Sequence, residues 1–179
     1  MKTVILFGSP RKDGNTRQLV DAFTTAMRSK QHDIRLLYLN DMNIRPCQGC
    51  MGCTESGVCR INDDMRDVSK YIMESDLIVY ATPVYWFAPS GQLKLAIDRC
   101  VAFFDKEYNS RIKGKKAITL MSCADQDSGT FQPAVDMFKK TFETLGVEYI
   151  GRVQASGCQE KASVAEEMLD AARRLAETL

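Results

Sequence analysis

The chain has 179 residues, which is enough for a single domain with a sizeable hydrophobic core. Its 45% hydrophobic and 26% charged content is typical of a water-soluble globular protein, and no apolar run approaches the ~20 residues of a membrane span. A net charge of +1 gives no electrostatic reason to expect a nucleic acid or a membrane surface as a partner.

Strand and helix patterns alternate along the chain without an intervening linker, which predicts one domain over residues 1–179. Five such pairs indicate a parallel sheet with helices on both faces. Gly151 indicates a bulge in the last strand. Strands are predicted near 2–7, 34–39, 77–81, 117–122 and 147–155, and helices near 15–29, 64–74, 90–104, 131–145 and 161–178.

A turn of small and polar residues, 8–16, joins the first strand to the first helix. Such a turn is where α/β proteins bind phosphate, because the first amides of a helix have no internal partner and the helix dipole attracts an anion. Gly8 and Gly14 let the backbone approach a ligand closely. The side chains that can donate hydrogen bonds or charge to a phosphate are Ser9, Asn15, Thr16, and Arg11 or Lys12.

The turn matches neither of the common nucleotide motifs. The Walker pattern needs four residues between its glycines and then Gly-Lys-Ser/Thr, whereas five residues separate Gly8 from Gly14 and Asn-Thr follows. The pattern Gly-x-Gly-x-x-Gly is also absent. A single terminal phosphate, as in FMN, therefore suits the turn better than a triphosphate or dinucleotide. The alternative is an ordinary turn in which Asn15 or Thr16 caps the helix.

A cysteine-rich loop at 46–60 follows the second strand, with the spacing C-x2-C-x2-C-x5-C. Thiolates select zinc, copper(I) or iron–sulfur clusters. The close spacing favours one cubane cluster, since structural zinc more often uses two separated C-x2-C knuckles. Zinc, and thiols that are free or disulfide-linked, remain as alternatives. The four cysteines are Cys47, Cys50, Cys53 and Cys59.

Aromatic residues and prolines cluster where the third strand ends. In an open α/β sheet, ligands bind beyond the carboxyl ends of the strands. A rigid apolar wall at this place suits a planar ring, although the same residues could simply cap the core. The wall is formed by Pro83, Val84, Tyr85, Trp86 and Phe87.

Other polar residues have simpler explanations. Lys94, Asp98 and Arg99 are predicted to lie on a solvated helix face. Asp63 precedes a helix and is expected to cap it. The only histidine, His32, is expected to be exposed after the first helix, so a catalytic triad is not credible.

Three motifs together resemble the NAD(P)H-dependent FMN reductases of flavodoxin-like fold. They are Gly-Ser-Pro-Arg-x-x-Gly-Asn-Thr at 8–16, Thr-Pro-Val-Tyr-Trp at 82–86, and Lys-x-x-x-Asp-Arg at 94–99. The resemblance covers residues 1 to about 120. It implies a doubly wound, five-stranded parallel sheet of order 2-1-3-4-5 in three αβα layers, with FMN where strands 1 and 3 meet. It also implies a homodimer or homotetramer.

The resemblance also implies roles for individual residues. With the compact four-cysteine motif added, the chain looks like the iron–sulfur flavoproteins, which implies a [4Fe-4S] cluster on the four cysteines. Ser122, with Cys123 beside it, falls where the family has a third flavin loop. The residues expected to hold FMN are Ser9, Arg11, Asn15, Thr16, Pro83, Val84, Tyr85, Trp86, Phe87 and Ser122.

The leading hypothesis is an oxidoreductase in which NAD(P)H, or an electron carrier, reduces FMN and a cluster exchanges single electrons with it. The acceptor would be a small molecule or a protein. Alternatives are a flavodoxin-like electron carrier, a cluster-free FMN or quinone reductase, and a zinc-bearing interaction domain. Seven cysteines, an odd number, and no recognisable leader suggest a reduced, cytoplasmic setting.

Overall fold

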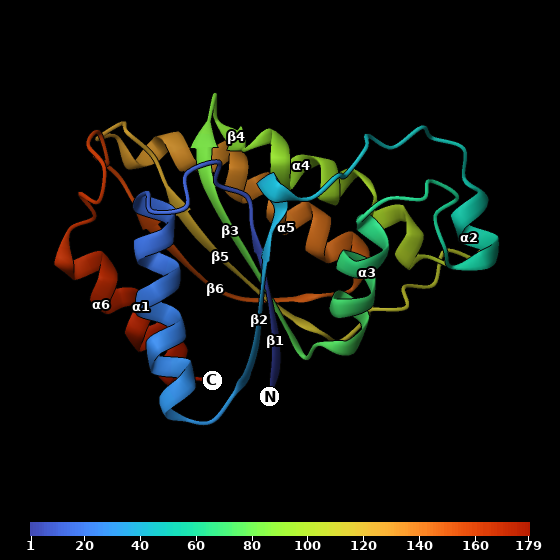
Figure 1. The fold of residues 1–179 in the computed structure, drawn as a ribbon, viewed down its shortest axis with the longest axis horizontal. Helices are drawn as coiled ribbons and strands as arrows, with labels where there is room; N and C mark the ends of the chain where they lie inside the picture. The colour runs from blue at the N-terminus through green and yellow to red at the C-terminus, as the bar shows by residue number, and fades with distance from the viewer.

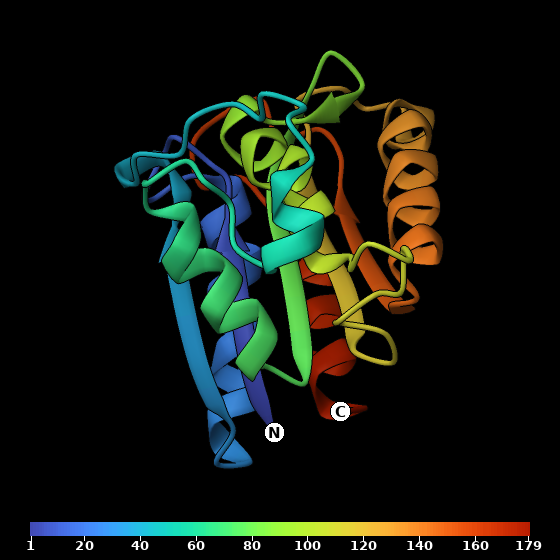
Figure 2. The same cartoon turned by 90° about the vertical axis from the view of Figure 1, so that its right-hand side faces the viewer.

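The computed structural model describes residues 1–179 as a three-layer α/β fold (Figures 1 and 2). Five parallel strands form the sheet in the order β2-β1-β3-β5-β6. This confirms the predicted order, and the added element is a two-residue strand that pairs antiparallel with β3. The strands are β1 (Lys2–Phe7), β2 (Asp33–Tyr38), β3 (Leu77–Tyr85), β4 (Ala88–Pro89), β5 (Lys116–Ser122) and β6 (Glu148–Ala155).

Helices cover both faces of the sheet. In Figure 1, α1 and α6 lie on one side, and α3, α4 and α5 lie on the other. None of the helices combines the length and apolar character needed to cross a bilayer. The helices are α1 (Asn15–Ser29), α2 (Gly52–Ser56), α3 (Met65–Glu74), α4 (Gly91–Asp98), α5 (Gln132–Leu145) and α6 (Glu166–Glu177), with short 3-10 segments η1 (Leu39–Asp41), η2 (Cys100–Phe103) and η3 (Ser128–Phe131).

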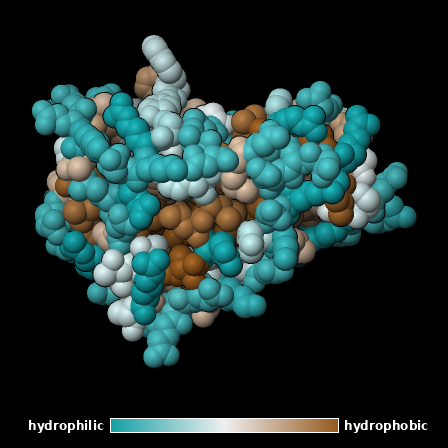
Figure 3. Space-filling model, in the orientation of Figure 1, coloured by the Kyte–Doolittle hydropathy of each residue, from teal (hydrophilic) through white to brown (hydrophobic).

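The strands divide the core into two halves because successive side chains point to opposite faces. In β1, Ile5 and Phe7 pack in the cluster under α1 and α6, while Val4 and Leu6 pack in the cluster under α3, α4 and α5. All four side chains are almost fully buried. Near-continuous apolar strands are what a parallel sheet covered on both faces requires. The surface over the edge strand β2 keeps an apolar patch (Figure 3).

The predicted bulge is present in β6. Ala117 pairs with Tyr149, but Ile118 pairs with Gly151, so Ile150 is the extra residue. A Cβ atom on Gly151 would lie 2.5 Å from a methyl carbon of Leu175, and glycine therefore lets α6 approach the strand.

Three expectations were wrong in detail. The helix predicted to reach residue 104 ends at Asp98 and continues as the 3-10 segment η2, and the last helix begins at Glu166 instead of 161. His32 is only partly exposed, and its Nδ1 atom is buried without a hydrogen-bond partner.

A tight hairpin between β3 and β4 projects from the carboxyl edge of the sheet (Figure 1). Its two central residues, Trp86 and Phe87, have φ angles of 48° and 64°. Positive φ at both positions is the pattern of a type I′ turn, which normally uses Asn or Gly. Trp86 is 93% exposed, so burial does not compensate for this strained backbone.

We expect glycine at position 86 to relieve this strain. Trp86→Gly should be more stable than Trp86→Ala by about 1 kcal/mol, because alanine keeps the steric penalty of positive φ. The exposed helical residue Lys139 provides the control: there glycine should be less stable than alanine by about 1 kcal/mol. Urea denaturation of the four variants measures both differences. If the glycine and alanine variants had the same order of stability at positions 86 and 139, the strained turn would be contradicted.

Candidate functional site

One cavity opens at the carboxyl edge of the sheet and is lined by the segments that follow four strands. It brings together Ser9, Arg11, Gly14, Asn15 and Thr16 after β1, Pro83, Val84 and Tyr85 at the end of β3, Ser122 at the end of β5 with Cys123 and Ala124 after it, and Cys158 and Gln159 after β6. Eight of the ten residues predicted to hold FMN therefore line a single cavity. Trp86 and Phe87 do not line it, because they form the hairpin turn beyond it.

The turn after β1 leads into α1 with its first backbone amides lacking an intrahelical acceptor. The Ser9 hydroxyl accepts a hydrogen bond from the Arg11 amide at 3.1 Å, which tightens the turn. Helix α1 begins after Gly14, which has no side chain to cap it. The Gly14 carbonyl is already the acceptor for the amides of Arg17 and Gln18, so the two amides before them have no intrahelical acceptor.

Two predicted phosphate ligands use their side chains elsewhere. The Asn15 side-chain amide donates to the carbonyls of Cys158 and Glu160, and its oxygen accepts from the Ser163 amide at 2.7 Å. The Thr16 hydroxyl bonds the Ser122 hydroxyl at 2.8 Å in a buried position. These side chains fix the turn against neighbouring loops. An anion there would meet the backbone amides, Ser9 and Arg11.

Of the two cations in the turn, only Arg11 is free of an ion pair. Lys12 pairs with Asp41 at 2.5 Å and lies over the Tyr38 ring, away from the cavity. Arg11 lines the cavity and has no carboxylate partner. Arg11 is therefore the cation of this turn that is placed to reach a group in the cavity.

Hydrogen bonds tie the turn to the segment around β3. The Ser90 hydroxyl donates to the Gly8 carbonyl at 2.6 Å, and the Ser90 amide donates to the Thr82 hydroxyl at 3.0 Å. A Cβ atom on Gly8 would lie 2.7 Å from the Cβ of Leu93, so only glycine allows this approach. The two walls of the cavity are thereby held at a fixed distance.

The cavity contains no histidine or carboxylate. Burial raises the pKa of the Cys123 thiol to about 11 and also raises the pKa of Cys158, so both thiols stay protonated at neutral pH. The lining therefore offers neither a general base nor a thiolate nucleophile. It is suited to bind and orient a group that carries its own chemistry.

A second cavity collects the four cysteines of loop 46–60. Cys47, Cys50, Cys53 and Cys59 all line it, and all four are free thiols. Apolar side chains of Met51, Ile61 and Val101 complete much of its wall. No three of the cysteines lie close enough together to bind one metal ion.

A buried ion pair closes the ends of this loop. Arg99 and Asp63 form two hydrogen bonds, of 3.0 and 3.2 Å, and their side chains are 1% and 0% exposed. Arg99 also donates to the Arg45 carbonyl at 2.8 Å, and Asp63 accepts from the Arg45 amide at 2.9 Å. Arg99 does not lie on a solvated face as predicted, because the cysteine-rich loop folds over it. Lys94 and Asp98 do lie on an exposed face, where they form an ion pair.

The ion pair affects the protonation of Asp63. Burial raises its pKa, but hydrogen bonds from Arg99 and the Arg45 amide outweigh burial and leave the pKa below its usual value. The Asp63 carboxylate also accepts from the Met65 amide, at the first residue of α3, at 3.2 Å. The N-cap itself is Asp64, whose side chain makes no capping bond.

One donor of the cysteine cavity has no partner. Arg99 lines the cavity, and its Nε atom is buried without a hydrogen bond. An unpartnered buried donor beside four thiols suits an anionic thiolate-bound group, because such a group would accept a hydrogen bond. The donor set and the cavity wall are therefore compatible with a thiolate-bound metal group.

The model of one family, described as NADPH-dependent FMN reductase, matches residues 1–162. The chain belongs to this family. Membership confirms the resemblance drawn from the turn at 8–16 and from the end of the third strand. It agrees with a cavity that joins these two segments.

Named relatives of this chain include iron–sulfur flavoproteins. One from Methanocaldococcus jannaschii is 38% identical over 55% of this chain and 51% of its own length. Another from Archaeoglobus fulgidus is 32% identical over 64% of this chain and 51% of its own. The chain thus spans about half the length of these relatives. A Bacillus subtilis protein, provisionally named an NAD(P)H-dependent FMN-containing oxidoreductase, is 26% identical over 88% of this chain and 86% of its own.

Solved structures support the fold of the family. The NAD(P)H:quinone oxidoreductase from Methanothermobacter marburgensis superposes with a TM-score of 0.84. The match covers 99% of this chain and 95% of that one at 22% identity. Because the sequence identity is low, this structural similarity is evidence for the flavodoxin-like fold alone.

Sequence reasoning missed the segment after β6. Cys158 and Gln159 line the first cavity, and Asn15 is anchored to the same segment. The signal was present in the predicted sheet, because the carboxyl ends of parallel strands share one edge. The loop after the strand near 147–155 therefore belonged among the candidates.

We expect the Arg99–Asp63 pair to be needed for stability. Asp63→Asn leaves a buried guanidinium without its counter-charge and should lower the free energy of unfolding by about 3–5 kcal/mol. The double variant Arg99→Met/Asp63→Leu removes both charges and should lose less than that single change. Lys94→Met, which breaks an exposed pair, should change stability by less than about 1 kcal/mol. Urea denaturation at neutral pH tests this order. A loss of unfolding free energy in the double variant as large as that in Asp63→Asn would contradict it.

The same pair predicts a dependence on pH. Folding lowers the pKa of Asp63, so its contribution is complete above the unfolded value of about 3.9 and is lost as pH falls through the lower folded value. The wild type should lose more unfolding free energy than Asp63→Asn between about pH 5 and about pH 3. If the free energy of unfolding fell equally with pH in the wild type and in Asp63→Asn, this linkage would be excluded.

Proposed function

We propose that the protein is an FMN-dependent oxidoreductase that takes reducing equivalents from NAD(P)H. The observation that carries this proposal is the single cavity that joins the turn after β1 to the end of β3. A reductase that does not bind FMN would not need a phosphate-type turn and an apolar wall on neighbouring strands. Family membership and the named relatives support the same activity.

The lining residues suit the parts of FMN. The amides at the start of α1, with Ser9 and Arg11, would hold the phosphate, and the side chains of Asn15 and Thr16 would keep the turn in place. Pro83, Val84 and Tyr85 would face the isoalloxazine ring and ribityl chain, with Ser122 and Cys123 beside them. When bound, FMN supplies hydride acceptance from nicotinamide. The protein supplies position and a site without competing acids or bases.

We further propose that the cysteine cavity holds a [4Fe-4S] cluster on Cys47, Cys50, Cys53 and Cys59. Support comes from the four free thiols lining one cavity, the unpartnered Arg99 donor, and the iron–sulfur flavoprotein relatives. A cluster supplies one-electron exchange, which would let the protein serve a small-molecule or protein acceptor. Arg99 would donate a hydrogen bond toward the thiolates.

A second candidate is a cluster-free FMN or quinone reductase. The observation in its favour is that no three of the cysteines approach within the range of one metal ion. Zinc needs four ligands at about 2.3 Å from a single centre, whereas the irons of a cubane are spread over its corners. The spacing of the cysteines therefore weighs against zinc more than against a cluster.

We also propose a homodimer or homotetramer working in the cytoplasm. The apolar hairpin beside the cavity, with Tyr85, Trp86 and Phe87 all exposed, supports an assembly that covers it. Seven free cysteines support a reducing compartment.

The phosphate contact gives a direct test. Arg11→Gln should weaken FMN binding by about tenfold or more, because it removes a charge-assisted hydrogen bond. Riboflavin, which lacks the phosphate, should bind the variant and the wild type equally. Arg28→Gln, an exposed and unpaired arginine on α1, is the matched control and should leave both affinities unchanged. Fluorescence titration measures these affinities, and failure of the wild type to bind FMN would remove the proposal.

Metal analysis tests the cluster. Protein purified without air should contain iron and sulfide in equal amounts, with little zinc. Cys50→Ser, at an exposed position, should lose this iron without loss of fold. Cys100→Ser changes a buried thiol outside the cysteine cavity and should keep it. Zinc in place of iron, or no metal with intact FMN binding, would favour the cluster-free alternative.

A further inference from the structure

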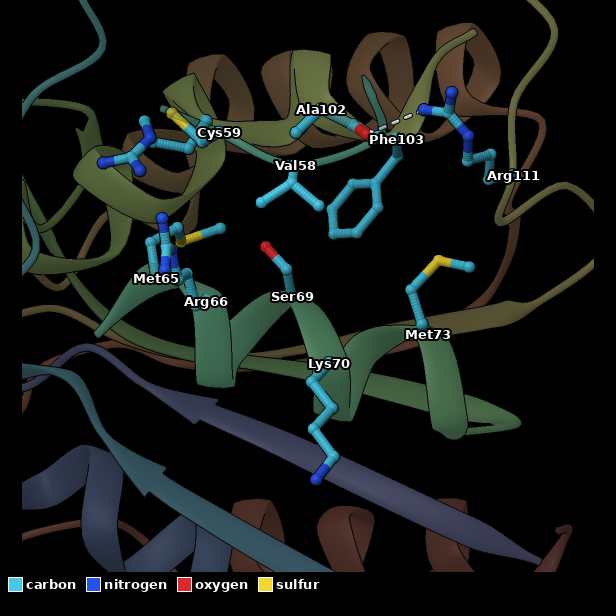
Figure 4. Close-up of a pocket in the computed structure, with 12 residues that line it drawn as sticks. Val58, Cys59, Met65, Arg66, Ser69, Lys70, Met73, Ala102, Phe103 and Arg111 are labelled. Atoms are coloured by element: carbon cyan, nitrogen blue, oxygen red, sulfur yellow. Dashed lines mark hydrogen bonds between the residues drawn. The ribbon is translucent and has the colours of Figure 1, made fainter. Parts of the chain in front are cut away.

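A third cavity lies between α3 and η2, beside the end of the cysteine-rich loop (Figure 4). It shares no lining residue with the cavity at the carboxyl edge of the sheet. It does share Cys59 and Arg99 with the cysteine cavity, so these two residues form a wall between the two spaces. An occupant would therefore sit on the cysteine side of the molecule, away from the proposed flavin site.

The walls of this cavity are mainly apolar. Figure 4 shows Val58 and Phe103 above α3, with Met65 and Met73 at the two sides and the Ser69 hydroxyl rising from α3 between them. Val58 is 54% exposed and Met73 is 41% exposed, although both are strongly apolar side chains. A ligand with a compact apolar body would cover them and gain the free energy of burying that surface.

Charges around the apolar walls are all positive. Arg66 lies at one end of the cavity and Arg111 at the other (Figure 4), and no aspartate or glutamate lines it. Neither arginine forms a salt bridge. Lys70 is a third basic residue of the lining, and its side chain extends from α3 away from the apolar side chains (Figure 4).

The guanidinium of Arg111 is held in position by neutral groups. It donates to the carbonyls of Ala102 at 3.1 Å and Thr54 at 3.3 Å, and also to that of Phe104. These bonds orient the group but do not neutralise it. Asp105 is the carboxylate that faces Arg111, and it lies outside the cavity lining.

We propose that this cavity binds an organic anion with a compact apolar body and a carboxylate or similar group. The apolar walls would contact the apolar body of the ligand. Arg66, with Arg111 at the opposite end, would bind its anionic group. Arginine is suited to this task because its planar fork matches a carboxylate. The proposal concerns a site separate from the flavin cavity and holds whether or not FMN binds there.

Naphthoate and its neutral analogue naphthamide provide matched probes, titrated by calorimetry into protein that contains saturating FMN. Wild-type protein should bind naphthoate about tenfold more tightly than naphthamide. Ser69→Phe places a ring in the cavity and should weaken both probes by about tenfold or more. Circular dichroism and thermal melting establish that this variant is folded.

Variants that remove one charge measure the electrostatic contribution to binding of the probes. Arg66→Gln should weaken naphthoate by about fivefold and leave naphthamide unchanged. Arg28→Gln, with the same loss of charge on the opposite face of the sheet, should change neither probe. Two results with the wild type would overturn the proposal: equal affinities for naphthoate and naphthamide, or no binding at about 1 mM ligand. Two results with the variants would also overturn it: unaltered binding by folded Ser69→Phe, or an unchanged preference for naphthoate in Arg66→Gln.

Discussion

The candidate flavin site depends on one constraint, which is that β1 and β3 are neighbouring parallel strands. Their pairing continues to the edge of the sheet, where Phe7 is opposite Ala81 and the Gly8 amide donates to the Ala81 carbonyl at 2.8 Å. The turn at 8–16 and the segment that follows Thr82 must therefore leave the same edge side by side. The chain runs from β1 to β2 on one side of β1 and then crosses back to β3 on the other side, and this change of direction opens the space between the two segments.

The cysteine-rich loop depends on a different kind of restraint. It has little regular structure apart from α2, and three of its residues, Gly49, Met51 and Gly57, have left-handed backbone. A loop of this kind keeps a defined path only if its ends are fixed. The Arg99–Asp63 pair does this by binding Arg45 before the loop and closing on Asp63 after it. Burial strengthens the pair because water does not compete for its hydrogen bonds.

Much of the fold could be predicted because the apolar periodicity is strong. The helix α1 and the strand β1 begin and end where the pattern does, and the sheet order follows from the family resemblance. The candidate site could be predicted as far as its segments, since strand ends gather at one edge. Most of the lining residues at 8–16 and 83–85 were identified in this way.

The partners of individual side chains could not be predicted. The helical pattern around Arg99 says nothing of a distant loop that folds over this residue. In the same way, Asn15 has the right position for a phosphate ligand, but its side chain binds a segment more than a hundred residues later in the chain. Such pairings depend on tertiary contacts between loops, and local propensity carries no information on them.

The hairpin has a practical consequence for following the molecule in solution. The chain contains one tryptophan, Trp86, and it stands almost fully in water next to the candidate flavin cavity. Its fluorescence therefore has a single origin, in a known place. A blue shift of the emission would report a surface closing over the tip, and quenching would report a chromophore arriving nearby. The protein thus has a built-in optical reporter at the rim of its cavity, which needs no added label.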